Sequence, residues 1–251
     1  MTFWTDIERE GGVVYEVGGG VRDQFLGRPI KDKDLVVTGL AWERLLSILR
    51  RHGTANLVGR SFGVAKFNPS GEPDLTYDIA LPRKEVSTGA GHRDFEVDFD
   101  PAIPIEIDLS RRDFTINAMA IRLQDGLLVD PFGGRADLAV RRLRMVFDRA
   151  FEEDPLRMVR AVQFAARLDL EIEPETWSRM KANVALITTV SGERIAAEEA
   201  RLGEPLLLSV GLADRRLLVR GAQPAVAVDR AHVHAVAREL RIPFAQHAFA
   251  S

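Results

Sequence analysis

The chain of 251 residues contains no cysteine, which excludes a disulfide framework and a thiolate metal site. It has no apolar run that approaches the length of a membrane-spanning helix, and acidic residues stand near its start where a secretory signal peptide carries basic ones. With a net charge of −3 there is no overall basic excess, so a surface for nucleic acid has to be local. We expect an ordinary globular protein in the cytoplasm, without contact with a membrane.

Apolar periodicity divides the chain into a part with strands and a following helical part. Strands are predicted at 13–17, 34–38, 63–67, 75–81 and 95–99. Helices are predicted at 21–26 and 41–51, and the polar stretch 83–94 is expected to be a loop. A helix at 115–121 and a hairpin edge at 127–129 complete this part.

Helical spacing dominates from residue 138 onward. Helices are predicted at 138–140, 155–168, 174–187 and 193–202. The fold class is therefore α+β, with a mixed-sheet domain at residues 1–147 and a helical segment at 148–203. The remaining residues, 204–251, lack lysine and contain one plausible helix, at 230–240, so their structure stays uncertain.

Two aspartates stand at the start of the second predicted strand, in the segment KDKDLVV. Asp32 and Asp34 are two residues apart, and residues i and i+2 of a strand project from the same face. Their carboxylates can therefore converge on one ion. Mg²⁺ prefers few carboxylates together with phosphate oxygens and water, so a nucleotide would complete such a site. Taken alone, the pair also fits a solvated turn.

The glycine triplet Gly18–Gly20 ends the first predicted strand. Glycines let backbone amides approach a phosphate closely, and Arg22 adds a fixed positive charge. A glycine triplet alone also fits an ordinary turn. The order of strand, glycine turn, Val-Arg-Asp, short helix, Asp-x-Asp and strand is more specific, because it places a phosphate cradle and a metal-binding pair on neighbouring strand ends.

The segment VGGGVRDQFLGRPIKDKDLVVTG resembles the signature of the class II tRNA nucleotidyltransferase (CCA-adding enzyme) and bacterial poly(A) polymerase family. Matches in the family's order cover about residues 13–197 and include YDIALPRKE, GHRDF, RRDFTINAMA, DPFGGRADL, EDPLRMVRAVQFAARL and SGERI. The resemblance implies a polymerase-beta-like nucleotidyltransferase head with a mixed sheet and a helical neck. It also implies Mg²⁺ as the cofactor, CTP and ATP as substrates, and the 3′ end of a tRNA as the acceptor.

The motif RRDFTINAMA begins with three charged residues and continues into an apolar stretch. Its residues alone fit a helix start, with Asp113 as the cap and Arg111 and Arg112 in solvent. The family resemblance implies instead that Arg112 contacts the nucleotide. It further implies that Asp113 and Asn117 help to order the sugar and phosphates.

The motif EDPLRMVRAVQF has the form of a helix start, with Asp154 as N-cap and Pro155 at the first helical position. Asp154 and Arg157 would lie on one face as an i, i+3 pair. The resemblance implies that this pair is a protein template for CTP and ATP, because a carboxylate and a guanidinium match an amino group beside an acceptor on the base. Arg160 would face the triphosphate. Gln163 stands where many family members have arginine, so one phosphate contact would be missing.

Three further segments carry weaker signals. Asp78 alternates with apolar residues in LTYDIAL and fits a strand beside the aspartate pair. It is a candidate third metal-site carboxylate or base for the attacking hydroxyl, and equally a surface charge at a strand edge. The stretch Glu106-Ile107-Asp108 replaces a more acidic sequence of the family, which we interpret as surface variation. In the family, loops like that at 83–94 influence the change from CTP to ATP.

The implied reaction is attack of an RNA 3′-hydroxyl on the α-phosphate of a nucleoside triphosphate, which releases pyrophosphate. Asp32 and Asp34 would hold up to two Mg²⁺ ions. The phosphates would be positioned by Gly19, Arg22, Arg112 and Arg160. A poly(A) polymerase, or an enzyme that adds only CC or A, is an alternative of the same class. A catalytically silent remnant that binds nucleotide or RNA is an alternative of a different class.

The resemblance stops soon after SGERI, and residues 204–251 do not resemble the body and tail with which family members grip tRNA. We therefore expect a chain without these regions. A natural compact enzyme, an altered reading frame near the end, and a fragment that needs a partner chain or a homo-oligomer each explain this departure.

Overall fold

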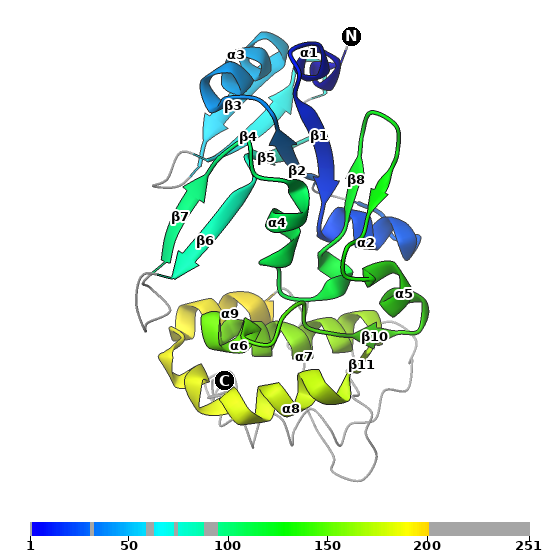
Figure 1. The fold of residues 1–251 in the computed structure, drawn as a ribbon, viewed down its shortest axis with the longest axis vertical. Coiled ribbons are helices and arrows are strands. Elements are labelled where there is room, and N and C mark those ends of the chain that lie inside the picture. The colour runs from blue at the N-terminus through cyan, green and yellow to red at the C-terminus, as the bar shows by residue number, and fades with distance from the viewer. Residues whose placement is uncertain (1, 31–32, 59–62, 73–74, 88–94, 201–251) are drawn as a thin grey trace, which may run out of the picture. The chain divides into compact units, whose positions relative to one another are not determined.

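The computed structural model describes residues 2–30, 33–58, 63–72, 75–87 and 95–200 (Figure 1). The predictions for Asp32 and for 204–251, including the helix at 230–240, lie outside the described residues. The chain divides into two units, Met1–Ala139 and Val140–Ser251, and each is considered by itself. In the described ranges, no helix combines the length and the apolar character that a membrane crossing requires.

The first unit is built on a seven-stranded sheet with the order β3–β4–β5–β2–β1–β8–β9. β2 and β5 are parallel, and every other neighbouring pair is antiparallel, so the sheet is mixed as predicted. The strands are β1 (Val13–Val17), β2 (Lys33–Thr38), β3 (Gly53–Leu57), β4 (Val64–Pro69), β5 (Tyr77–Ala80), β8 (Ala120–Arg122) and β9 (Leu128–Val129).

Two helices cover one face of this sheet, α1 (Phe3–Arg9) and α3 (Trp42–His52). The predicted helix at 41–51 is confirmed as α3, whose fully buried Leu45, Ile48 and Leu49 recur at helical spacing and so form one apolar stripe. The ring of Phe3 meets that of Phe67 at a centroid distance of 4.8 Å. This core fixes which face of each strand is buried.

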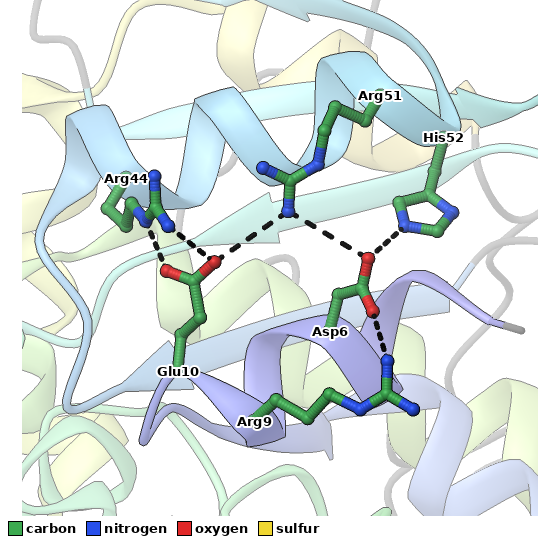
Figure 2. A network of polar contacts seen from close by, with 6 residues as sticks. All are labelled: Asp6, Arg9, Glu10, Arg44, Arg51 and His52. Atoms are coloured by element: carbon green, nitrogen blue, oxygen red, sulfur yellow. Dashed lines mark hydrogen bonds and ion pairs between the residues drawn. The ribbon is translucent and has the colours of Figure 1, made fainter.

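A charged network joins α1 to α3 on their outer surface (Figure 2). His52 Nε2 lies 2.8 Å from Asp6 Oδ2, and Arg51 reaches both Asp6 and Glu10 at 3.8 and 3.7 Å. Arg44 donates two hydrogen bonds to Glu10, one of them at 2.7 Å. The hydrogen bond with His52 is the main cause that holds the pKa of Asp6 below its ordinary value of 3.8.

Three short helices and a ribbon complete the first unit. The helices are α2 (Gly19–Phe25), α4 (Ile105–Ser110) and α5 (Gly134–Ala139). The predicted loop at 83–94 is wrong over its first residues, because β6 (Arg83–Ser87) pairs with β7 (Phe95–Phe99) as an antiparallel ribbon. A ribbon needs backbone partners rather than a continuous apolar face, so the polar residues of β6 concealed it from hydrophobic periodicity.

The helix predicted at 115–121 is also wrong. Only a 3-10 turn, η1 (Thr115–Asn117), forms there, and the chain then enters β8. β8 pairs with β1 through Ala120 opposite Val17. Because residues 114–120 are buried throughout, their apolar run carried no periodicity that separates a helix from a strand.

The second unit is helical around α7 (Leu156–Leu168). The other helices in its described part, residues 140–200, are α6 (Ala150–Glu153), α8 (Pro174–Asn183), η2 (Val184–Thr189) and α9 (Gly192–Ala200). The short strands β10 (Arg142–Leu143) and β11 (Glu171–Ile172) pair in parallel. α7 ends at Asp169, which has left-handed angles, and Leu170 N donates to Ala165 O at 3.0 Å.

Candidate active site

Asp34 and Asp78 occupy facing positions on the parallel strands β2 and β5. Their neighbours Leu35 and Ile79 are buried in the core that α1 and α3 cover. Because successive strand residues alternate between faces, both aspartates lie on the opposite face of the sheet. Asp34 is exposed and Asp78 partly so. The structure therefore brings the two candidate carboxylates side by side on a face that solvent reaches.

Lys66 extends this row onto a third strand. It stands opposite Asp78 in the antiparallel pair of β4 and β5, and its Nζ donates to Asp78 Oδ1 at 2.8 Å and Oδ2 at 3.1 Å. The row across the sheet thus reads Lys66, Asp78, Asp34. Sequence reasoning missed Lys66, because its distance from Asp78 depends on strand pairing and not on any local motif.

The donor set on this face suits a hard divalent cation, since Asp34 and Asp78 offer carboxylate oxygens. Asp32, the other predicted ligand, lies outside the described residues. Among those that are described, no group of three or more His, Cys, Asp or Glu side chains is arranged to hold a metal ion. The face supplies two carboxylates that fit Mg²⁺ but not, by themselves, a full coordination shell.

The glycine turn lies against the predicted nucleotide-binding arginine. Gly18 has a φ of 69°, and a Cβ atom there would stand 2.6 Å from Arg112 Nη1. Its amide donates to Met119 O at 3.2 Å, which joins the turn to the start of β8. A side chain at this position would both strain the backbone and displace Arg112. The following Gly19 begins α2 and lies beside Arg22.

Arg22, Asp113 and Asn117 form one buried network. Arg22 Nη1 donates to Asn117 Oδ1 at 2.6 Å, and Asn117 Nδ2 donates to Asp113 Oδ1 at 3.0 Å. Arg22 is 4% exposed and also donates to Asp23 at 2.8 Å. Asp113 Oδ1 accepts from Phe114 N at 2.8 Å. The structure therefore gathers these three predicted residues behind the glycine turn.

Asp108 contradicts the interpretation of residues 106–108 as surface variation. Glu106 and Ile107 are exposed, but Asp108 is completely buried. Its Oδ1 accepts from Arg111 Nη2 at 2.6 Å, and its Oδ2 accepts from Arg112 Nη2 at 3.2 Å. The spacing i, i+3 and i+4 places both arginines on the side of Asp108, and this spacing is the signal that sequence reasoning overlooked.

The electrostatics of Asp108 follow from these contacts. Burial raises the pKa of the Asp108 carboxyl, but the charges of Arg111 and Arg112 outweigh burial, and the pKa lies below its ordinary value of 3.8. The carboxylate is therefore ionised at neutral pH, in a position where one negative charge meets two positive ones.

Asp154 and Arg157 lie one turn apart at the start of α7, and Arg157 N donates to Asp154 O at 3.0 Å. Asp154 Oδ1 accepts from Leu156 N at 3.2 Å, as a capping side chain does. The Arg157 side chain is 9% exposed, donates to Ala150 O at 3.3 Å and lies over the Phe147 ring at 5.3 Å. The described contacts thus lead these two side chains to separate partners.

Helix α9 is fastened to α7 by two ion pairs that sequence reasoning missed. Arg194 Nη2 lies 3.2 Å from Asp154 Oδ2, and Arg160 Nη1 donates to Glu198 Oε1 at 3.2 Å. Gln163 is 2% exposed and donates to Glu198 O at 3.5 Å. Arg194, which belongs to the SGERI motif, and Glu198 are four residues apart, a spacing that places both side chains on one face of a helix. This spacing was the signal available in the sequence.

Comparison with known proteins gives matches over most of the described chain. Residues 14–144 match the family of the poly A polymerase head domain, and residues 169–202 match the probable RNA and SrmB-binding site of polymerase A. The multifunctional CCA protein of Nitrosococcus oceani is 47% identical over 171 residues, which are 68% of this chain and 39% of that protein. The one from Stenotrophomonas maltophilia is 42% identical over 222 residues, 87% of this chain and 48% of that protein.

Solved structures agree with these relatives. An apo CCA-adding enzyme superposes with a TM-score of 0.71 at 34% identity, covering 81% of this chain and 48% of that one. The Bacillus stearothermophilus CCA-adding enzyme in complex with CTP gives 0.67 at 33% identity, covering 80% and 46%. The Thermotoga maritima enzyme in complex with tRNA gives 0.64 at 34% identity, covering 79% and 45%.

The mixed-sheet head and the helices that follow it define a nucleotidyltransferase fold of the CCA-adding type. The chain belongs to the class II CCA-adding enzyme and poly(A) polymerase family, of which it contains the head and neck. It spans 39% of the length of one curated relative and 48% of another.

Proposed function

We propose that the chain transfers CMP and AMP from CTP and ATP to the 3′ end of tRNA without a nucleic-acid template, releasing pyrophosphate, in the cytoplasm. The observation that carries this proposal is the pair Asp34 and Asp78, side by side on one face of the sheet in a head of this family. Relatives solved with CTP, ATP and tRNA support the choice of substrates.

Mg²⁺ would be held by Asp32 and Asp34, with Asp78 as a third carboxylate. When bound, the metal would polarise the α-phosphate and neutralise charge on the leaving pyrophosphate. The role of the chain itself is to hold its carboxylates side by side on one face of the sheet. The pairing of β2 with β5 does this for Asp34 and Asp78, because register alone fixes their separation.

The triphosphate would be positioned near the glycine turn. Arg112 lies against Gly18 and offers a guanidinium that is partly exposed, with 19% of its side-chain surface accessible. Gly19 would leave room for a phosphate, and Arg22 would contribute charge from behind the turn. Asp113 and Asn117 would keep Arg22 and the turn in place and help to order the sugar.

The base would be selected at the start of α7. Asp154 accepts hydrogen bonds from Leu156 N and Arg194, and a carboxylate has further lone pairs for the amino group of cytosine or adenine. Arg157 would donate to the neighbouring ring acceptor. Arg160, held by Glu198, would face the triphosphate.

The experiment that tests the proposal supplies tRNAs that lack CCA, CA or A at their 3′ ends, and a generic RNA, with labelled CTP or ATP and Mg²⁺. CMP and AMP addition confined to the tRNAs supports CCA addition. AMP addition to generic RNA would instead make the chain a poly(A) polymerase, and addition of only CC or only A would make it a partial enzyme. Extension of none of these RNAs would refute the proposed transfer.

A second candidate function is favoured by the contact of Asp78 with Lys66, because a lysine on a candidate metal-site carboxylate competes with a metal ion. In that case the chain would be a catalytically silent remnant that binds nucleotide and transfers nothing. Mg²⁺-dependent binding of CTP and ATP, measured by calorimetry, without extension of any RNA would favour this silent remnant. Restoration of extension by a second polypeptide would point to a missing partner region.

A further inference from the structure

We infer that Asp108 is a positioning residue that holds Arg112 against the glycine turn and ties it to the base of the β6–β7 ribbon. The role of Arg112 in binding phosphate rests on the proposed function. The contacts that place Arg112 do not depend on that function, so a failure of the positioning role can be distinguished from a failure of the proposed function.

The carboxylate of Asp108 is the central group of this arrangement. Asp108 lies on α4 with no exposed surface, and an isolated charge buried in this way would be strongly unfavourable. It accepts from Arg111, from Arg112 and from the backbone amide of Arg83 at 3.2 Å. A buried carboxylate with donors from three positions is held in one orientation, so it can serve as a fixed reference point for its partners.

The two oxygens of the Asp108 carboxylate are shared unequally between the two arginines. Arg111 donates twice to Oδ1, from Nη2 at 2.6 Å and from Nε at 3.1 Å. Arg112 has the single longer contact with Oδ2, at 3.2 Å. The shorter, double contact pairs Arg111 with the carboxylate. Asp108 therefore neutralises Arg112 less completely than Arg111, and an anionic phosphate would be attracted to Arg112.

The guanidinium of Arg112 is confined by its neighbours. Its Nη1 donates to Asn117 O at 3.5 Å and lies where a Cβ on Gly18 would approach to 2.6 Å. Its buried Nε has no hydrogen-bond partner among the residues that the structure describes. The orientation of the guanidinium therefore depends on its two Nη groups, of which one is held by Asp108 and the other by Asn117.

Asp108 also contacts the β6–β7 ribbon. The amide of Arg83, the first residue of β6, donates to the same Oδ1 that Arg111 uses. Asp108 thus links the start of the ribbon, the end of α4 and Arg112. A displacement of Arg83 at the start of the ribbon would therefore shift Asp108 and, through it, Arg112.

The experiment compares Asp108→Asn with the matched control Arg111→Gln, which alters the other arginine of the same carboxylate. CTP affinity is measured by calorimetry with Ca²⁺, so that no transfer occurs. Asp108→Asn should weaken CTP binding about tenfold or more, because a charge-assisted bond that orients Arg112 is lost. Arg111→Gln should change it by less than about threefold. Equal losses in both variants would overturn the inference.

A double-mutant cycle separates positioning from general damage to the fold. In the background of Arg112→Lys, Asp108→Asn should cost little further CTP affinity, since the two residues act through one contact. A full additional loss would overturn the inference. Where Asp108→Asn does not fold, Asp108→Glu keeps the charge and lengthens the side chain, and unchanged CTP affinity in that variant would also overturn it.

A readout without nucleotide separates this inference from the proposed function. In the ¹⁵N spectrum of arginine side chains of the full chain, the Arg112 Nη2 group, which donates to Asp108, should show restricted rotation that Asp108→Asn abolishes. Persistence of the restricted signal would overturn the inference. Absence of CTP binding by the unaltered chain would instead refute the proposed function, with the spectrum still deciding the role of Asp108.

Discussion

Lys66 donates both to Oδ1 and to Oδ2 of Asp78, at 2.8 and 3.1 Å, from the strand next to the one that carries this aspartate. The candidate metal-site carboxylate is therefore already paired with a cation of the protein. The side chains are 51% and 39% exposed, so the pair adds little to the stability of the fold. Its main consequence is for the charge that a metal ion meets.

Replacement of Lys66 should lower the Mg²⁺ requirement. In Lys66→Met, Asp78 no longer has a competing cation, and the Mg²⁺ concentration for half-maximal CMP transfer should fall by a few-fold, as for one exposed charge pair. Direct Mn²⁺ binding, followed by electron paramagnetic resonance, should tighten in parallel. Lys181→Met, an exposed lysine of the second unit, is the control and should change neither value. A raised Mg²⁺ requirement in Lys66→Met would show that Lys66 does not compete with the metal ion for Asp78.

The buried carboxylate of Asp108 should make the first unit sensitive to acid. Its folded pKa lies below the ordinary value of 3.8, so its stabilising contribution is complete above that pH and is lost as the pH falls through the folded pKa. Asp108→Ala should lower the free energy of unfolding at pH 7 by about 1.5–3 kcal/mol, because two partly buried arginines lose charge-assisted hydrogen bonds to this carboxylate. Urea unfolding at pH 7 and pH 3 measures this. A variant whose deficit is as large at pH 3 as at pH 7 would argue against the ion pairs as its cause.

The network between α1 and α3 should matter for local order rather than for the site. Asp6→Asn removes the carboxylate that His52 and Arg51 contact, so amides of α1 should exchange with solvent faster, while CTP affinity stays unchanged. The folded pKa of Asp6 is lowered, so this protection is present above pH 3.8 and declines as the pH falls through the folded pKa. Hydrogen exchange of α1 at pH 7 that is identical in both proteins would rule out the contribution.

Loss of Arg194 should relax the choice of nucleotide. Arg194→Gln frees the carboxylate of Asp154 from one partner, so its orientation toward a base becomes less defined. Incorporation of UMP and GMP relative to CMP should rise by about threefold to tenfold. Arg179→Gln, which breaks an exposed pair with Asp148 in the same unit, is the control and should leave the ratio unchanged. An unchanged ratio of UMP and GMP to CMP incorporation in Arg194→Gln would show that Arg194 has no part in the choice of nucleotide.

Local patterns in the sequence predicted much of the fold. Strands at 13–17 and 34–38 and the helix at 155–168 carried clear apolar periodicity, and they form β1, β2 and α7. The stretch 115–121 was misread, because a segment buried on every side has no polar face to reveal its period. The polar β6 was missed because a two-stranded ribbon does not require alternation.

The candidate site was predictable where a motif is local and not where strands or helices must first pair. Gly18 and Arg112 belong to separate motifs, and only the fold shows that they touch. Lys66 lies beside Asp78 through strand register, and Asp108 gains its partners because its end of α4 is buried. Such contacts depend on tertiary packing, which a single sequence does not display.

The proposed place of Asp34 in a nucleotidyl-transfer site is tested by incorporation of labelled CMP and AMP into tRNA that lacks its terminal CCA. We expect Mg²⁺-dependent incorporation by the unaltered chain and a loss of about a hundredfold or more in Asp34→Asn, with the fold and thermal midpoint retained. Undiminished incorporation by purified Asp34→Asn would contradict it.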